Sequence, residues 1–263
     1  MALGTALWTV MTGAARKAAR AMKRDFGEVE QLQVSRKGPS DFVSAADIKA
    51  EKTLRVELEK ARPKFGFLME EAGEIKGDDP QHRWIIDPID GTTNFLHGIP
   101  HFAISIALQM DKEIIAGLVF NPITEELFYA EKGKGAFLND RRLRVSARSD
   151  LGDAIIATGI PFRGIPGHKP FLSRLERVME VTAGVRRMGT ASLDLAYVAA
   201  GRCDGFWEAG LKPWDIAAGL LLVQEAGGFI SDLSGGKTML TSGDVLAANS
   251  RLHRPLLSLL KDG

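Results

Sequence analysis

Acidic residues follow or open apolar segments at three separate places in the chain, a pattern that suits metal chemistry. The four carboxylates are those of Glu70, Asp87, Asp90 and Asp215. Unit charges about 4 Å apart at an effective dielectric constant near 20 repel by roughly 4 kcal/mol per pair, so their convergence requires cations. No histidine or cysteine stands at ligand spacing beside them. Ligands that are all oxygen select a hard ion, so the four residues predict a Mg²⁺ site.

The surroundings of Asp87 and Asp90 suit a phosphate held by metal. The apolar tripeptide before them predicts a buried strand that stops at Asp87, so both acids lie at the end of a strand. Gly91 removes a side chain where backbone amides can approach a ligand, and Thr92 adds a hydroxyl. Asp-Gly alone is also typical of an ordinary polar turn. The whole string DPIDGTTNF, residues 87–95, is far more specific than that dipeptide.

This string resembles the metal-binding signature of the inositol monophosphatase family, within the fructose-1,6-bisphosphatase-like superfamily. The dipeptide Trp214-Asp215 resembles a second block of that family, and the resemblance covers essentially the whole chain. It implies a mixed α+β and α/β fold, a layered α-β-α-β-α sandwich of the inositol monophosphatase or sugar phosphatase type. The chain departs from the family at Met69, where a glycine usually precedes two glutamates.

The carboxylates and the resemblance together lead to a hypothesis of two Mg²⁺ ions. Glu70, Asp87 and the backbone carbonyl of Ile89 would hold one ion. Asp87, Asp90 and Asp215 would hold the other. Two ions about 3.5 to 4 Å apart can bind a phosphate, lower the pKa of a water molecule and stabilise a leaving alkoxide. A third, weaker Mg²⁺ near Glu70 is implied by the resemblance alone.

The resemblance also assigns the residues that handle the attacking water. Thr92 with Asp47, beside Glu70, would orient this water, and Lys37 matches a lysine that the family carries in a nearby loop. Asp47 has a structural explanation too, because it stands three residues after Ser44 in the pattern of a capping box. Both roles are compatible, since the first turn of a helix is a favourable place for an anion near metals.

Substrate contacts follow from the same reasoning. The backbone amides of Gly91 and Thr92 would carry the remaining charge of the phosphate. Asp90 and Glu208 are candidate acceptors for ring hydroxyls. The positions that match the family's contacts to the substrate ring are Gly189, Thr190, Ala191 and Glu208. Without the resemblance, a glutamate such as Glu208 would more often be a surface charge.

The charge balance favours a small-molecule partner. The 34 basic and 33 acidic residues are interspersed and give a net charge of +1, so the chain lacks the electrostatic footprint of a protein that binds nucleic acid or a membrane surface. Cys203 is the only cysteine, which excludes an internal disulfide framework. No apolar run reaches the roughly 18 residues that a membrane span needs. The apolar start precedes Arg16 and Lys17, the reverse of a secretory signal. We therefore expect a cytoplasmic protein.

The order of predicted elements divides the chain into two halves. Residues 1–146 predict two helices and an antiparallel meander, an α+β half that carries most metal ligands. Residues 147–263 alternate strands and helices, an α/β half that carries Asp215 and the contacts to the substrate ring. In the helix that begins near Trp214, one apolar face is predicted from Ile216, Leu220 and Val223.

The resulting hypothesis is an enzyme that hydrolyses inositol 1-phosphate to inositol and phosphate by a metal-activated water. The resemblance also implies inhibition by Li⁺ and a homodimer. Sibling phosphatases that act on fructose 1,6-bisphosphate, 3′-phosphoadenosine 5′-phosphate or histidinol phosphate share every metal ligand, so they are an open alternative. A haloacid-dehalogenase phosphatase has acids two residues apart, whereas Asp87 and Asp90 are three apart. A non-catalytic partner-binding module is the third alternative, although binding alone does not require four converging acids.

Overall fold

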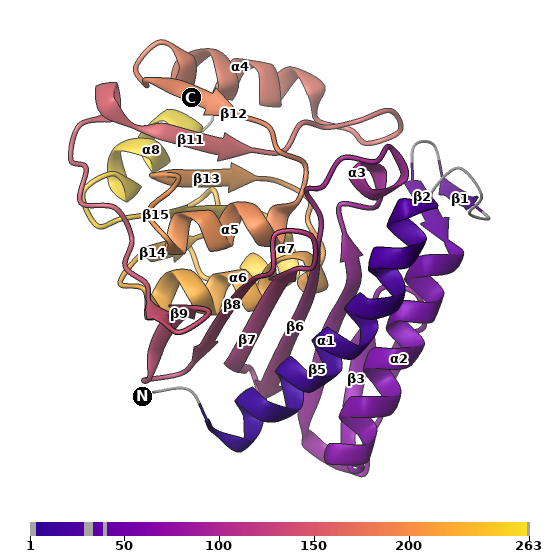
Figure 1. The fold of residues 1–263 in the computed structure, drawn as a ribbon. Helices are drawn as coiled ribbons and strands as arrows, with labels where there is room; N and C mark the ends of the chain where they lie inside the picture. The colour runs from indigo at the N-terminus through magenta and orange to yellow at the C-terminus, as the bar shows by residue number, and fades with distance from the viewer. Residues whose placement is uncertain (1–3, 29–33, 39–40, 262–263) are drawn as a thin grey trace.

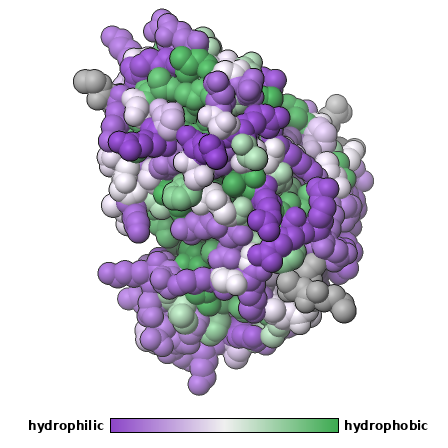
Figure 2. Space-filling view, turned by 90° about the vertical axis from the view of Figure 1, so that its left-hand side faces the viewer, coloured by the Kyte–Doolittle hydropathy of each residue, from purple (hydrophilic) through white to green (hydrophobic). Residues whose placement is uncertain are grey.

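Two β-sheets, with helices between them and on both outer faces, make up the structure (Figure 1). The computed structural model describes residues 4–28, 34–38 and 41–261, and it describes only the backbone of residues 34–38 and 41–43. The face shown in Figure 2 is mostly polar, with scattered apolar patches. Within the described residues, no helix combines the length and the apolar character that a membrane span requires.

The larger sheet has eight strands in the order β10-β9-β8-β7-β6-β5-β3-β4. Their bounds are β3 (Phe65–Met69), β4 (Gly73–Ile75), β5 (Asp79–Asp90), β6 (Ala103–Met110), β7 (Glu113–Asn121), β8 (Glu126–Glu131), β9 (Gly135–Leu138) and β10 (Arg141–Arg142). Strands β6, β7 and β8 pair antiparallel, which confirms the predicted meander. Strand β3 lies parallel to β5, so Glu70 after β3 and the acids at the end of β5 lie at the same edge of the sheet.

Helices α1 (Ala6–Gly27) and α2 (Ala45–Ala61) cover the outer face of this sheet (Figure 1). An apolar stripe of α1 faces the core, where Met11, Ala15, Ala18 and Met22 are buried. Strands β1 (Val34–Gly38) and β2 (Asp41–Ser44) form an antiparallel pair that leads into α2. The hydroxyl of Ser44 accepts hydrogen bonds from the first turn of α2, so the predicted capping box is confirmed.

The smaller sheet has five strands in the order β12-β11-β13-β15-β14. Their bounds are β11 (Ile155–Thr158), β12 (Gly184–Arg186), β13 (Gly205–Glu208), β14 (Phe229–Ser231) and β15 (Val245–Ala248). Three of the helices in this half are the short η2 (Leu151–Asp153) and α7 (Met239–Ser242) and the longer α4 (His168–Met179). Together with the terminal helix α8 (His253–Leu260), α4 covers the outer face (Figure 1).

Helices α5 (Ala191–Ala199) and α6 (Pro213–Glu225) lie between the two sheets (Figure 1). The prediction of a single apolar face on α6 was wrong, because every residue from 216 to 223 is buried. A helix with a sheet on either side has no face left for solvent. Close packing here requires glycine: a Cβ on Gly117 of β7 would lie 2.8 Å from the carbonyl oxygen of Ala218. The five layers confirm the predicted fold.

One apolar cluster spans the two predicted halves. The chain changes from the larger sheet to the smaller one between β10 and β11, close to residue 146. However, the largest apolar cluster joins Ile85 and Val119 of the larger sheet to Leu221 of α6 and Phe206 of β13. The division into residues 1–146 and 147–263 as separate domains stays a prediction.

Candidate active site

A cavity of about 510 Å³ opens where the ends of β5, β11 and β13 meet the first turns of α5 and α6. Eleven of the residues predicted for the site line it: Glu70, Asp87, Ile89, Asp90, Gly91, Thr92, Gly189, Thr190, Ala191, Glu208 and Asp215. Asp47 does not line the cavity, and the side chain of Lys37 lies outside the described residues. The structure therefore brings together acids that are up to 145 residues apart in the sequence, the interval from Glu70 to Asp215 (215 − 70).

Strand β5 continues to Asp90, so the prediction that it stops at Asp87 was wrong. Asp87 pairs with Ser105 and Asp90 with Ala103, so a bulge places two residues of β5 opposite one of β6. In a regular strand, residues three apart point to opposite faces. The bulge removes this difference and lets both carboxylates line the same cavity. The amide of Ile89 donates to Oδ1 of Asp87 at 3.0 Å, which fixes the bend.

The carboxylate of Asp90 caps a helix from another part of the fold. Its Oδ2 accepts a hydrogen bond of 2.7 Å from the amide of Ser192, in the first turn of α5. Thr190 occupies the N-cap position but donates its own hydroxyl to the carbonyl of His101 at 2.9 Å. Burial raises the pKa of Asp90 to about 6, against the opposing effect of the hydrogen bonds from Ser192 and Ala191.

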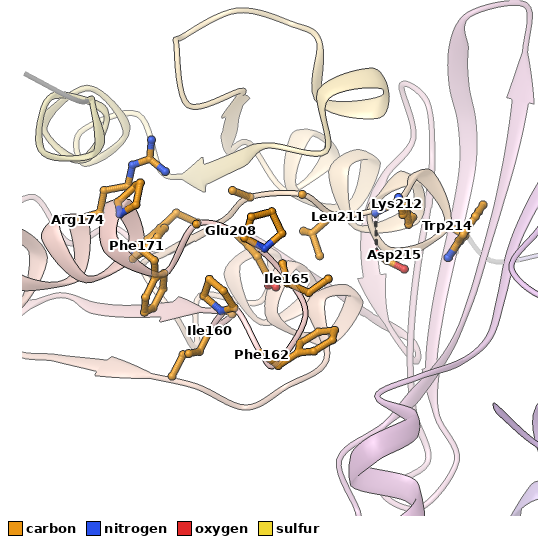
Figure 3. Close-up of a pocket in the computed structure, with 18 of the residues that line it drawn as sticks. Ile160, Phe162, Ile165, Phe171, Arg174, Glu208, Leu211, Lys212, Trp214 and Asp215 are labelled. Carbon is orange, nitrogen blue, oxygen red and sulfur yellow. Dashed lines mark hydrogen bonds between the residues drawn. The ribbon is translucent and has the colours of Figure 1, made fainter. Parts of the chain in front are cut away.

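Asp215 lies in the first turn of α6, as predicted. Its Oδ2 accepts a hydrogen bond of 2.7 Å from the amide of Lys212, the contact drawn in Figure 3. Pro213 begins the helix, where its missing N–H removes no helical hydrogen bond. Burial raises the pKa of Asp215 well above its ordinary value, and the charges of Asp90, Glu70 and Glu208 raise it further.

Glu70 stands directly after β3, on a turn that another acid holds. The buried Glu51 of α2 accepts hydrogen bonds from the amides of Glu71, at 2.8 Å, and Ala72, at 3.0 Å. The sequence reasoning missed Glu51, although its position four residues after Asp47 places both acids on one face of the helix. Met69 is fully buried and pairs regularly with Ile86, so the missing family glycine leaves the strand intact.

Thr92 and Asp47 meet behind the cavity wall. The hydroxyl of Thr92 lies 3.2 Å from Oδ1 of Asp47 and 3.0 Å from the carbonyl oxygen of Ile89, and it can donate to either. Oδ2 of Asp47 accepts from the amide of Ser44 at 2.8 Å as part of the capping box. Burial raises the pKa of Asp47, whereas the hydrogen bonds from Ser44 and Thr92 oppose that rise. The structural and the proposed catalytic contacts of Asp47 therefore coexist.

Gly91 begins the short helix α3 (Thr92–Leu96) at a place where no side chain fits. Its φ of +93° lies in the left-handed region, and a Cβ there would lie 2.5 Å from the hydroxyl oxygen of Thr190. The glycine thus allows the loop after β5 to pack directly against the segment that opens α5.

Glu208 ends β13 beside the cavity. A Cβ on Gly159 would overlap its carboxylate, so the glycine leaves the space that this side chain occupies. Burial raises the pKa of Glu208 to about 8, with a further contribution from the charge of Asp90 and an opposing one from Arg187. Arg187 lines the cavity, and burial also raises the pKa of Asp194 well above its ordinary value. The sequence reasoning missed Arg187 and Asp194, because only the fold brings their charges close to Glu208.

The donor set of the cavity fits Mg²⁺. Burial raises the pKa of Asp87 well above its ordinary value, and the charges of Glu70, Asp90 and Asp215 raise it further. Such mutual repulsion is the property that a divalent cation would relieve. Among the described residues, no three acidic, histidine or cysteine side chains are already gathered as a ligand set. Asp90 and Asp215 each direct one oxygen to a backbone amide, which leaves the other oxygen for a cation.

We expect Asp87→Asn to stabilise the metal-free protein. Asparagine removes a repelling charge but keeps the Oδ1 that accepts from Ile89. The free energy of unfolding in chelator should rise by about 1 to 3 kcal/mol at pH 8. Because the folded-state pKa of Asp87 is raised, its neutral form stabilises the fold at low pH, and this stabilisation is lost as the pH rises through that pKa.

Urea unfolding of both proteins in chelator at pH 5 and pH 8 measures this difference. The gain for Asp87→Asn should be larger at pH 8 than at pH 5. A variant that is less stable than the parent at both pH values would contradict the repulsion between these carboxylates.

Comparisons with known proteins identify the family of the chain. The family model described as "Inositol monophosphatase family" matches residues 5–262. The chain is 59% identical to the "Inositol-1-monophosphatase" of Mesorhizobium japonicum, over 98% of this chain and 97% of that protein. It is 45% identical to the "Nus factor SuhB" of Pseudomonas aeruginosa, over 94% and 93% of the two chains.

A crystal structure of the extragenic suppressor protein suhB from Bartonella henselae superimposes with a TM-score of 0.96. Its sequence is 58% identical, and the match covers 98% of this chain and 100% of that one. The family model and these relatives extend over nearly the whole sequence, so the chain belongs to the inositol monophosphatase family.

Proposed function

We propose that the protein is a Mg²⁺-dependent phosphomonoesterase that hydrolyses inositol 1-phosphate to inositol and phosphate. The observation that carries this proposal is the cavity in which Glu70, Asp87, Asp90 and Asp215 meet. Burial raises the pKa of Asp87 and Asp215, and the charges of neighbouring carboxylates raise it further, as expected of a site built for cations. The family, with relatives named "Inositol-1-monophosphatase", supplies the class of reaction and the substrate.

Two groups of residues would hold Mg²⁺. Glu70, Asp87 and the carbonyl of Ile89 form one group, whereas Asp87, Asp90 and Asp215 form the other. When bound, Mg²⁺ supplies positive charge that lowers the pKa of a water molecule and balances the charge on the phosphate and the leaving oxygen. A third ion beside Glu70 is part of the same proposal.

Thr92 and Asp47 orient the water that attacks phosphorus. When the hydroxyl of Thr92 donates to the buried Asp47, its oxygen can accept a hydrogen bond from a water molecule in the cavity. The backbone amides of Gly91 and Thr92 are donors for the phosphate oxygens on the same side. Lys37 is proposed to act beside these residues on the strength of the family resemblance alone.

The ring of the substrate would lie between α5 and the end of β13. Gly189, Thr190 and Ala191 line the same cavity as Glu208. Glu208 and Asp90 are the acceptors for ring hydroxyls, and Arg187 adds a positive charge nearby. Inhibition by Li⁺ and assembly as a homodimer are further proposals. The absence of a nucleic-acid partner is also only a proposal, because some relatives are named "Nus factor SuhB".

We expect Glu208→Ala to lower kcat/KM more for a substrate with ring hydroxyls than for an ester without them. An unpaired buried polar partner costs about 1 to 3 kcal/mol, so kcat/KM for inositol 1-phosphate should fall roughly tenfold or more. A plain ester such as p-nitrophenyl phosphate has no ring hydroxyls and should be largely spared. Steady-state kinetics on both esters give the ratio, with the exposed Glu180→Ala as the control. Equal losses on both esters would show that Glu208 is structural.

We expect Glu51→Gln to weaken the response to Mg²⁺. Glutamine presents one amide donor where the amides of Glu71 and Ala72 both need an acceptor, so the turn that carries Glu70 loses one of its two supports. The concentration of Mg²⁺ that gives half-maximal activity should rise about tenfold, as for other residues that orient metal ligands.

The control for Glu51→Gln is Glu59→Gln, an exposed glutamate on the same helix. Activity titrations with Mg²⁺ and thermal melts are measured on both variants. A lower Tm with an unchanged Mg²⁺ requirement would show that Glu51 acts on stability alone.

A further inference from the structure

A second cavity of about 590 Å³ joins the carboxylate site and has mainly apolar walls. We call it the apolar lobe and define it by six residues that line it: Ile160, Phe162, Ile165, Phe171, Leu211 and Trp214. Figure 3 shows several of these side chains on one side of the cavity, with Asp215 on the other. None of the substrate contacts proposed above, Glu208 excepted, lines this lobe.

The loop 159–167 between β11 and α4 exposes three large apolar side chains beside this cavity. The exposed fractions are 42% for Ile160, 44% for Phe162 and 41% for Ile165. The loop is anchored at its base, where the hydroxyl of Thr158 donates to the carbonyl of Trp207 at 2.8 Å. Exposed apolar side chains that gather at a cavity, rather than singly on the surface, indicate a binding surface.

The apolar lobe and the carboxylate site are continuous. Glu70, Glu208 and Asp215 line both cavities, and Ile160 and Phe162 lie on the wall that the two share. A phosphate held by the carboxylate site can therefore place its leaving group in either cavity. In one cavity the group meets residues 189–191, which open α5, and in the other it meets Ile165, Phe171 and Trp214.

Apart from Glu70, Glu208 and Asp215, which also line the carboxylate site, the charged residues that line the lobe are Arg174 and Lys212. Nε of Arg174 donates to the carbonyl of Leu260 at 2.9 Å, on the side of α8. Phe171 and Trp207 pack together at its inner wall, with ring centroids 5.1 Å apart. An aromatic ring gains from such surroundings, because burial removes apolar area from water without leaving hydroxyls unpaired.

We propose that the apolar lobe is a second leaving-group subsite, which accepts phosphate monoesters of alcohols that carry an aromatic ring. The proposal rests on the proposed function for the position of the phosphate, and it adds a substrate class that the polar ring site does not explain. The reaction stays the same hydrolysis: water adds to phosphorus, the P–O bond to the alcohol breaks, and the alcohol leaves with a proton.

The test compares two esters that differ only in an aromatic ring. Phenethyl phosphate and ethyl phosphate both release a primary alcohol, so the chemical step is matched. For the full-length protein in Mg²⁺, we expect kcat/KM to be about tenfold higher for phenethyl phosphate, because its ring is buried in the lobe. Ile165→Ser should reduce this ratio about threefold or more. The control is Phe229→Ser, at an apolar residue of β14 that is 53% exposed and does not line the lobe.

Each outcome decides the proposal. A parent ratio near one overturns it, and so does a ratio that Ile165→Ser leaves unchanged. If Ile165→Ser alters only the oligomeric state, measured by light scattering, the lobe is covered by a second copy of the chain and the proposal is wrong. Turnover of inositol 1-phosphate is measured in parallel. If inositol 1-phosphate is not hydrolysed but the phenethyl-to-ethyl ratio is high, only the proposed substrate is wrong. If inositol 1-phosphate is hydrolysed but the ratio is near one, only the proposed subsite is wrong.

Discussion

Repulsion between buried carboxylates is the constraint that organises this structure. Each aspartate of the cluster has one oxygen bound to a backbone amide: Asp87 to Ile89, Asp90 to Ser192 and Asp215 to Lys212. These bonds hold acids at the end of β5 and at the first turn of α6, and they leave further oxygens for a cation. The bulge in β5 and the N-termini of α5 and α6 therefore meet at one place, where they supply the acids and the backbone amides that bind them.

Residues behind the cavity stiffen the same arrangement. Helix α2 presents two buried acids one turn apart, of which Asp47 accepts from Thr92 and Glu51 holds the turn after Glu70. Helix α2 therefore connects Thr92, the proposed water-orienting residue, to the turn that follows Glu70, a proposed metal ligand. Gly91 and Gly159 complete the site by leaving space that any side chain would fill.

The sequence located the acids because their signals are local: a capping box and a specific nine-residue string can both be recognised from neighbouring residues. It placed the end of β5 too early, since Pro88 and Gly91 are strand breakers in isolation and only pairing with β6 maintains the strand through a bulge. A single apolar face was predicted for α6 for a similar reason: the apolar spacing within the helix does not reveal that a second sheet covers its other face. Arg187 and the apolar lobe depend on tertiary contacts between distant segments, so no local signal identifies them. For Glu51, the four-residue spacing from Asp47 is a local signal, but its contact with the turn after Glu70 is tertiary.

The most direct test of the account is a calorimetric titration of Mg²⁺ into the chelator-treated protein. Because the pKa values of Asp87, Asp90 and Asp215 are raised, binding near pH 6 should displace protons, and the number released should fall toward pH 8. Repeating the titration in buffers of different ionisation enthalpy counts those protons. The account predicts two Mg²⁺ ions per chain, with proton release that decreases as the pH rises. Absence of binding, or binding without proton release at pH 6, would contradict it.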